Sequence, residues 1–208
     1  MIMSSGSRPT LASGAGDSDR AGSTADAERV TLRNGATIVV RPLAAGDEAA
    51  ITSWFAGLGA ETRYARFFGW LDRLDRRTRS ELVRVDHRGR EAITARAVDG
   101  TTVGIARYIR LGESRAAEVA VAVADDWSGQ GVATLLLERV AAKARAVGIQ
   151  QFTAACLVTN RTVIRLLSRL GTASVGPPDA GIVTIRIDLT RRHTAEVTSA
   201  PGRPGRRT

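Results

Sequence analysis

Four consecutive residues, Ser128-Gly129-Gln130-Gly131, separate a stretch of alternating apolar residues from a stretch with helical periodicity. The first N–H groups of a helix are unpaired and carry partial positive charge, so such a junction accepts phosphate. Because glycine has no side chain, it can adopt positive φ and allows a ligand to approach the backbone closely. The stretch lacks the Gly-Lys-Ser/Thr end of a Walker loop and the third glycine of a dinucleotide-binding fingerprint. The sequence therefore predicts a phosphorylated ligand held by a loop of neither kind.

A single carboxylate, Glu118, precedes this loop within a run of alanine and valine. The alternation over 118–123 is typical of a strand, with valines on one face and Glu118 beside alanines on the other. The small side chains leave room for a ligand against that face. A carboxylate placed there is a candidate general base. The alternative is a strand-end carboxylate that pairs with one of the many arginines.

Helical spacing returns after the loop, where one apolar face can pack against a sheet. The apolar positions of this expected helix are Ala133, Leu136, Leu137, Val140, Ala144 and Val147. Strand, loop and helix together predict a unit that positions both the carboxylate and the phosphate site.

The rest of the chain supplies the elements around that unit. Asn34-Gly35 predicts a hairpin of 30–33 and 36–40, because this dipeptide tolerates the positive φ of a tight turn. Asp47 is expected to cap a helix that reaches Leu58. We expect further helices at 64–71, 72–84 and 163–170, and further strands at 91–98, 101–111, 152–158 and 181–189. This mixture predicts an α+β fold with a largely antiparallel sheet.

The loop resembles motif A of the GNAT superfamily of N-acetyltransferases, in which Gln or Arg, then Gly, then Gly or Ala occupy three defined positions. Here Ser128, Gly131 and Ala133 stand at those positions, and Ser128 departs from the pattern. Asn160, after the next expected strand, resembles the family's motif B. Segment 61–68 resembles the corresponding part of bacterial protein-lysine acetyltransferases. The resemblance covers residues 29–189.

The resemblance implies an acetyl-CoA-dependent N-acetyltransferase with a mixed, largely antiparallel sheet flanked by helices. In that family, strand amides pair with the pantetheine arm and loop amides bind the pyrophosphate. The cofactor-binding residues implied here are Val121, Val123, Ser128, Gly129, Gln130, Gly131, Val132, Ala133, Thr134 and Asn160. For Asn160, a cap of the following helix remains an equal alternative. Glu118 matches the strand glutamate that removes a proton from the acceptor amine, which is almost wholly protonated at pH 7.

The acceptor is expected to be a protein lysine, with a small-molecule amine as the alternative. Lys143 is the only lysine among 30 Lys and Arg residues, which would limit self-modification, although coding bias explains the composition equally well. A catalytically weak acyl-CoA sensor remains open as a different class of protein. It is suggested by Ser128 and by Leu166-Leu167-Ser168, which stand where many family members have a tyrosine that protonates the leaving thiolate.

The 208 residues, 43% of them hydrophobic, suffice for one domain, which we place at 29–189. Residues 1–28 and the basic segment 190–208 are expected to be disordered tails.

No apolar run approaches the ~20 residues of a membrane span, and the single cysteine, Cys156, excludes an intrachain disulfide, so a cytoplasmic location is expected. The chain has a net charge of +9, of which the expected tails 1–28 and 190–208 carry −2 and +4, so the domain carries +7, which favours anionic ligands such as acetyl-CoA. We expect no metal site, no membrane partner and no nucleic acid; the oligomeric state is left open.

Overall fold

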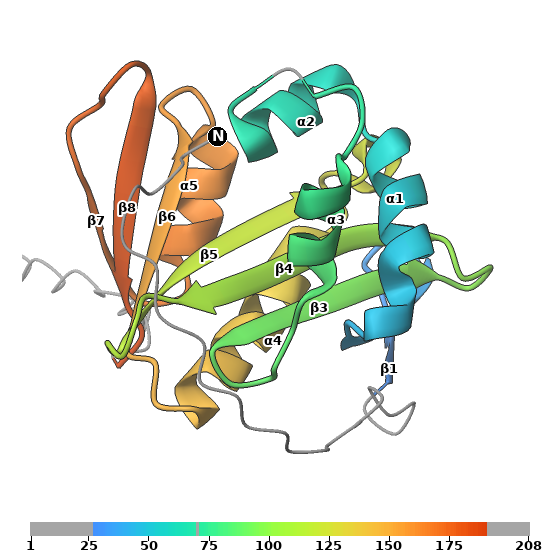
Figure 1. Ribbon diagram of the computed structural model, residues 1–208, viewed down its shortest axis with the longest axis horizontal. Coiled ribbons are helices and arrows are strands. Elements are labelled where there is room, and N and C mark those ends of the chain that lie inside the picture. Colours follow the sequence, from blue (N-terminus) through green and yellow to red (C-terminus); the bar gives the residue numbers. More distant parts are fainter. Residues whose placement is uncertain (1–26, 70, 191–208) are drawn as a thin grey trace, which may run out of the picture.

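A computed structural model describes residues 27–69 and 71–190 of the chain. Its centre is an eight-stranded sheet in the order β1-β2-β3-β4-β5-β6-β8-β7 (Figure 1). Every neighbouring pair is antiparallel except β5 and β6, which are parallel. The prediction of an α+β fold with a largely antiparallel sheet is confirmed.

The strands follow the sequence pattern closely. Their bounds are β1 Glu28–Thr31, β2 Thr37–Pro42, β3 Arg90–Ala97, β4 Thr102–Arg110, β5 Ala116–Val123, β6 Gln151–Leu157, β7 Thr172–Val175 and β8 Ile182–Asp188. The hairpin around Asn34-Gly35 is present, and its first strand begins at Glu28, the last residue of the expected N-terminal tail. The remaining tail residues lie outside the described part of the chain, apart from Ala27 and Thr190. Strand β7 was not expected, because four residues are too short a run to show alternation.

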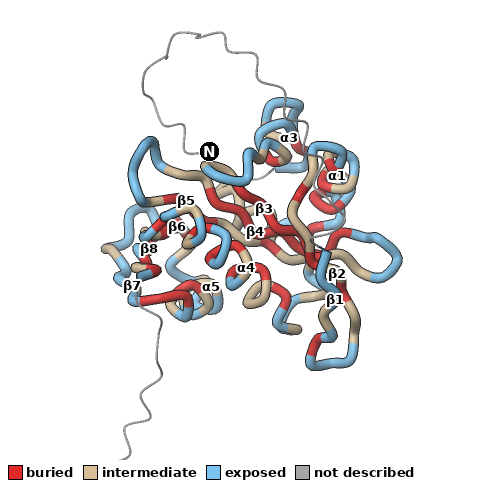
Figure 2. The backbone as a smooth tube through the Cα atoms, turned by 90° about the horizontal axis from the view of Figure 1, so that it is seen from below, coloured by how far each residue is buried: buried red, intermediate tan, exposed pale blue. Residues whose placement is uncertain are grey.

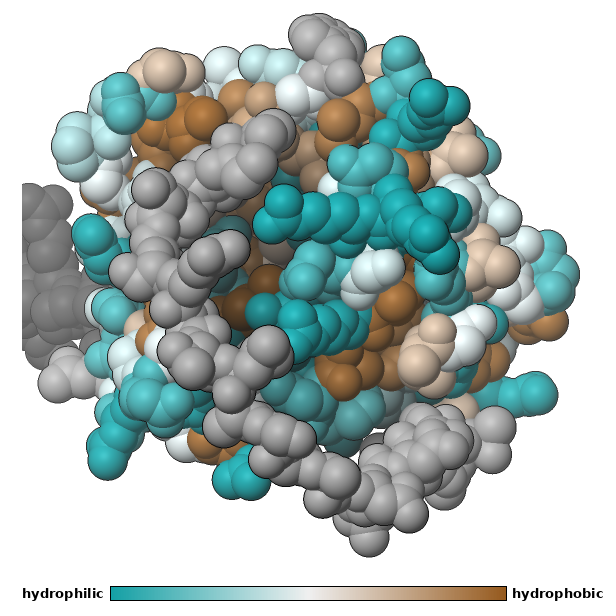
Figure 3. All heavy atoms as spheres, viewed as in Figure 1, coloured by the Kyte–Doolittle hydropathy of each residue, from teal (hydrophilic) through white to brown (hydrophobic). Residues whose placement is uncertain are grey.

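Three helices cover one face of the sheet: α1 Glu48–Ala56, α2 Ala60–Phe67 and α3 Arg76–Val83 (Figure 1). Ile51, Phe55 and Leu82 from α1 and α3 join Ile105 of β4 in a buried cluster on this face. Helix α3 is shorter than the expected 72–84, because Asp75 accepts a hydrogen bond from the Thr78 N–H and so caps the helix there. Figure 3 shows hydrophilic side chains over much of the described part of this face, with hydrophobic areas between them.

Asp47 stands at the N-terminal boundary of α1, as predicted, but its side chain does not cap that helix. One carboxylate oxygen accepts hydrogen bonds from Arg41, at 2.7 Å, and Arg96, at 2.6 Å. The other accepts from the Ala44 N–H at 2.9 Å. Asp47 therefore ties β2, β3 and the entry to α1 together. The sequence could not reveal this role, because the preference of Asp for helix N-termini is a local property and both arginine partners lie on strands.

The opposite face carries α4 Val132–Ala146 and α5 Arg161–Ser168. Figure 2 shows the buried strands between this pair of helices and the α1–α3 layer. Leu136, Leu137 and Val140 of α4 are fully buried against the sheet, as the spacing predicts. Gly104 allows the close fit, because a Cβ there would lie 3.1 Å from Leu136 Cδ1. Among the described residues, no helix combines the length and apolar character needed to cross a bilayer.

Candidate active site

One cavity holds about 930 Å³ of solvent-accessible space, within the range of small-molecule sites. It extends from α2 on one face of the sheet, along β5 and β6, to the start of α4 and to α5 on the other face. All of the residues predicted from the sequence line it: Glu118, Val121, Val123, Ser128, Gly129, Gln130, Gly131, Val132, Ala133, Thr134 and Asn160. The fold thus brings the candidate base and the candidate phosphate loop into one cavity.

The cavity opens where β5 and β6 separate. These parallel strands pair only at Ala116–Gln151, Ala117–Phe152 and Glu118–Thr153. Strand β5 nevertheless continues to Val123 and β6 to Leu157. Beyond Glu118, main-chain groups on the facing edges are therefore outside the β5–β6 ladder and can pair with an extended ligand.

The phosphate loop ends in a helix that no side chain caps. Gly131 occupies the N-cap of α4 with φ of 92°, a left-handed conformation that glycine adopts without strain. A Cβ at this position would meet no atom within 4 Å, so the space in front of the helix is open. The first N–H groups of α4 therefore point at unfilled space with the positive end of a 15-residue helix behind them. This arrangement suits a diphosphate.

Glu118 is exposed at the point where the strands part, with cationic side chains around it. Arg66 of α2 lines the same cavity, 4.9 Å above the Phe67 ring. Burial lowers the pKa of Arg66, and the negative charge of Glu118 opposes that effect. Arg107 of β4 is only 6% exposed, and its Nε is buried without a hydrogen-bond partner in the described part of the chain. Burial, followed by repulsion from Arg66 and Arg90, lowers the pKa of Arg107 to about 10.

The sequence analysis left an arginine partner of Glu118 open as an alternative but singled out neither Arg66 nor Arg107. A signal for Arg107 was available, because it is the one charged residue between Ile105 and Ile109 on an otherwise apolar strand face. Register then places it diagonally across from Glu118, since Ile109 pairs with Glu118 and Arg107 with Ala120. For Arg66 the one signal was its place in segment 61–68, because its own position depends on how α2 packs over the sheet.

Helix α2 is attached to the end of β5 through Asp125. The Asp125 carboxylate accepts hydrogen bonds from the Gly59 N–H, at 2.7 Å, and from the Thr62 hydroxyl, at 2.5 Å. A Cβ at residue 59 would lie 2.3 Å from the Asp125 carboxylate. The glycine therefore allows α2 to begin directly above the loop that leads to the phosphate site, and this fixes the helix that carries Arg66.

Asn160 and Cys156 line the far wall. The Asn160 Oδ1 accepts a hydrogen bond of 3.1 Å from the Val163 N–H, so Asn160 caps α5, one of the two predicted alternatives. Its Nδ2 makes no hydrogen bond to a described residue. Cys156 is 3% exposed, and burial raises the pKa of its thiol, which keeps it protonated near neutral pH. A covalent route through Cys156 is therefore not favoured.

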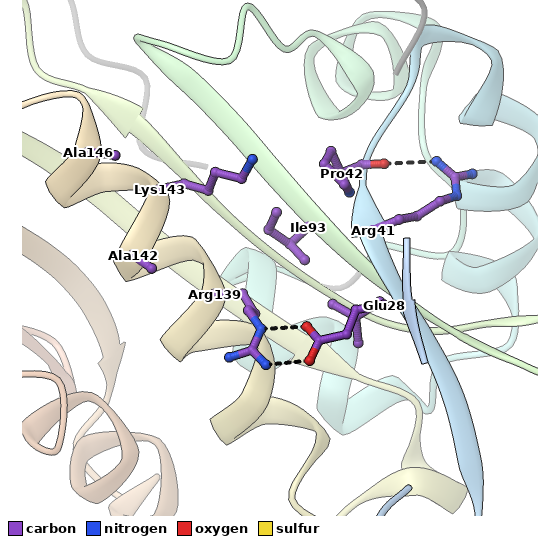
Figure 4. A pocket seen from close by; sticks show the side chains of 9 residues that line it. Glu28, Arg41, Pro42, Ile93, Arg139, Ala142, Lys143 and Ala146 are labelled. Carbon is purple, nitrogen blue, oxygen red and sulfur yellow. Dashed lines mark hydrogen bonds and ion pairs between the residues drawn. The ribbon is translucent and has the colours of Figure 1, made fainter. Parts of the chain in front are cut away.

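A second cavity, of about 360 Å³, lies between β1–β3 and the outer side of α4 (Figure 4). Arg139 and Glu28 close one end of it with two hydrogen bonds, of 2.9 and 2.8 Å. Hydrogen bonding to Arg139 lowers the pKa of Glu28. This cavity contains no residue of the predicted site.

Comparison with known proteins agrees with this geometry. Residues 53–172 match the sequence profile of the acetyltransferase (GNAT) family. The GNAT domain of PAT from S. lividans has a similar structure, with a TM-score of 0.73 and 30% identity over 80% of this chain and 99% of that domain. Acetyltransferase Pat of Mycolicibacterium smegmatis is 29% identical over 77% of this chain, and acetyltransferase PA5475 of Pseudomonas aeruginosa is 29% identical over 72%.

The family match over residues 53–172 defines the class of the protein, an acyl-CoA-dependent transferase. The chain belongs to the GNAT acetyltransferase family, as the sequence motif indicated. It spans 48% of the length of the M. smegmatis relative and 82% of the P. aeruginosa relative.

Proposed function

We propose that the protein transfers the acetyl group of acetyl-CoA to a lysine side chain of another protein, with Glu118 as general base. The observation that carries the proposal is the position of Glu118. It is the carboxylate exposed at the end of the paired part of β5 and β6, within the cavity that holds the phosphate loop. A base at this point faces both the opening between the strands and the α2 side of the cavity.

The residues present fit acetyl-CoA, which supplies the activated acyl group when it is bound. The N–H groups from Gly129 to Thr134 would hold the pyrophosphate, and the edges of β5 at Val121 and Val123 would hold the pantetheine arm. Asn160 offers to the same arm its Nδ2, which makes no hydrogen bond to a described residue. Main-chain donors fixed in a sheet and at a helix start are already oriented, so binding needs little reorganisation.

In the proposed reaction the acceptor nitrogen forms a bond to the thioester carbonyl carbon, and the carbon–sulfur bond breaks. Glu118 accepts the proton that the amine loses, directly or through water. Arg66 and Arg107 add positive charge to this region, which disfavours an acceptor ammonium relative to the neutral amine. No tyrosine lines the described cavity, so solvent is expected to protonate the departing thiolate.

A protein acceptor is supported by the similarity to the Pat acetyltransferases and by the resemblance of segment 61–68, which includes part of the cavity wall. The opening beside α2 lies on a face that a folded partner can approach. The scarcity of lysine agrees with a protein acceptor but does not require one.

The test uses isotopically labelled acetyl-CoA. Candidate folded proteins, and separately polyamines and amino acids, are incubated with the enzyme and examined by mass spectrometry. We expect one or a few lysines of a folded protein to be modified rapidly, and denaturing that acceptor to slow the reaction. Acetylation of free amines alone would contradict the protein acceptor, while the transferase assignment would stand.

A further inference from the structure

The tip of the β1–β2 hairpin belongs to the wall of the active-site cavity, although sequence analysis gave it no role in the site. Val30 to Asn34 line the cavity together with the phosphate loop. Leu32 is buried in the core and anchors the tip, whereas Arg33 beside it is exposed. An exposed arginine on an anchored turn thus contributes to the wall of the cavity that also includes the start of α4.

One hydrogen bond joins this tip to the phosphate loop, and a second, within the loop region, holds the Gln130 side chain that accepts it. Asn34 Nδ2 donates to Gln130 Oε1 at 2.7 Å, and Gln130 Nε2 donates to the Asp126 carbonyl at 2.7 Å. Asn34 Oδ1 accepts from the Ala36 N–H at 3.1 Å, so both ends of the amide are engaged. The side chain of Gln130 therefore connects the hairpin tip to the loop, and Arg33 is positioned relative to the α4 N-terminus.

The phosphate loop itself contains no cationic side chain. Residues 128–134 offer only main-chain N–H groups, the helix dipole and two polar side chains besides Gln130. Three arginines line the cavity: Arg33, Arg66 and Arg169. Arg66 lies at the Glu118 end, which leaves the phosphate end without its charge. Glu138 also lines the wall, but no ion pair or hydrogen bond joins it to Arg33 among the described residues.

We propose that Arg33 binds a phosphate group of acyl-CoA from the hairpin side and supplies the side-chain charge that loop 128–134 lacks. The inference rests on the proposed function, because it requires acyl-CoA in this cavity. A guanidinium presents several donors in a planar fork that matches phosphate oxygens. Asn34 and Gln130 act as positioning residues, since they fix the tip on which Arg33 stands.

The test measures dissociation constants of CoA and of 3′-dephospho-CoA by titration calorimetry. Arg33→Ala should weaken CoA binding about tenfold, the scale of one charge-assisted hydrogen bond at a partly exposed site. Arg33→Lys should recover part of the loss. Asn34→Ala should weaken binding less than Arg33→Ala, because the guanidinium remains but is less well positioned.

Arg29→Ala is the matched control, because Arg29 is an exposed arginine of the same hairpin outside the cavity wall. If Arg33→Ala no longer weakens binding when the ligand is 3′-dephospho-CoA, the contact is to the 3′-phosphate. If Arg33→Ala weakens binding of both ligands equally, the contact is to the diphosphate. Either result supports the proposal. If Arg33→Ala binds CoA as tightly as Arg29→Ala does, the inference is wrong while the function stands. If the unaltered protein binds no CoA, the proposed function fails first.

Discussion

At the residue scale, the proposed chemistry depends on one carboxylate in a positively charged setting. Glu118 lies near Arg66 and Arg107 and beside strand edges that are free to bind a ligand. A cation near the reacting amine and a base that accepts its proton act in the same direction, because both favour the neutral amine.

Replacing Glu118 by Gln keeps the shape of the side chain but removes its capacity to accept a proton. We expect turnover to fall by about 10²- to 10⁴-fold, with the dissociation constant of acetyl-CoA unchanged. Steady-state kinetics and calorimetry measure the two quantities. Glu113→Gln, in the exposed turn before β5, is the control. A Glu118→Gln enzyme with near-normal turnover would show that the base lies elsewhere.

Replacing Gly131 by Glu places a side chain and a negative charge in front of α4. We expect acetyl-CoA binding to be lost, because the carboxylate would compete with the pyrophosphate for the same N–H groups. Gly100→Glu is the matched control, since Gly100 also has positive φ, of 87°, and open space around its Cβ position. Thermal unfolding of both variants separates backbone strain from the loss of a binding site. The assignment of the loop would be contradicted by a folded Gly131→Glu protein with unchanged CoA affinity.

At the element scale, the ion-pair cluster around Asp47 joins three segments. The Asp47 carboxylate is buried, which by itself raises its pKa, but hydrogen bonds from Arg41 and the Ala44 N–H and the charge of Arg96 bring the pKa below its ordinary value. A carboxylate with a lowered pKa in the folded state stabilises the fold above pH ~3.8. That contribution is lost as pH falls through the folded-state pKa.

Asp47→Asn should therefore lower the free energy of unfolding at pH 7 by about 2–4 kcal/mol, since two arginines lose their partner. The difference from the unaltered protein should shrink as pH falls below 4. Urea unfolding at several pH values measures both effects. Asp72→Asn, at an exposed position that forms no ion pair within the described part of the chain, should change little. A constant difference between pH 7 and pH 3 would show that the charge of Asp47 is not responsible.

The elements themselves were largely predictable, because alternation and helical spacing are local properties of the sequence. The β-loop-α unit of Glu118 and Gly131 was found in this way. What the sequence could not show depends on contacts between distant segments. Asp47 was predicted to cap a helix because of its residue type and its place before an apolar helical pattern. Its actual partners, Arg41 and Arg96, lie on strands and could not be identified from local sequence. Arg33 and Arg66 received no individual role from the sequence, because only the packing of the hairpin and of α2 brings them to the cavity.

At the scale of the whole molecule, the sheet is the scaffold that places the candidate phosphate loop and the candidate base in one cavity. The α1–α3 layer forms the side that includes Arg66, and α4 and α5 form the side that faces the cofactor region (Figure 1). The sequence resemblance indicated this fold, because the motif occupies a defined position in a family of known structure.

The short pairing of β5 with β6 also bears on how the molecule opens. Strands β6, β8 and β7 pair extensively with one another but meet the rest of the sheet only at the three β5–β6 pairs. Segment 151–190 is therefore expected to behave as a separate cooperative unit, with amide hydrogens that exchange through a local opening rather than through global unfolding.

Acetyl-CoA bound between β5 and β6 would join this unit to the remainder of the sheet. Hydrogen–deuterium exchange should then slow across β8, including Val183 and Ile185, which are buried and do not line the cavity. Exchange in β2, on the far side of the sheet, should change little. Slowing confined to the residues that line the cavity would mean that the unit does not open as a whole. Slowing throughout β8 would mean that the ligand acts as a removable link between two foldons, so that cofactor concentration sets the stability of the C-terminal segment.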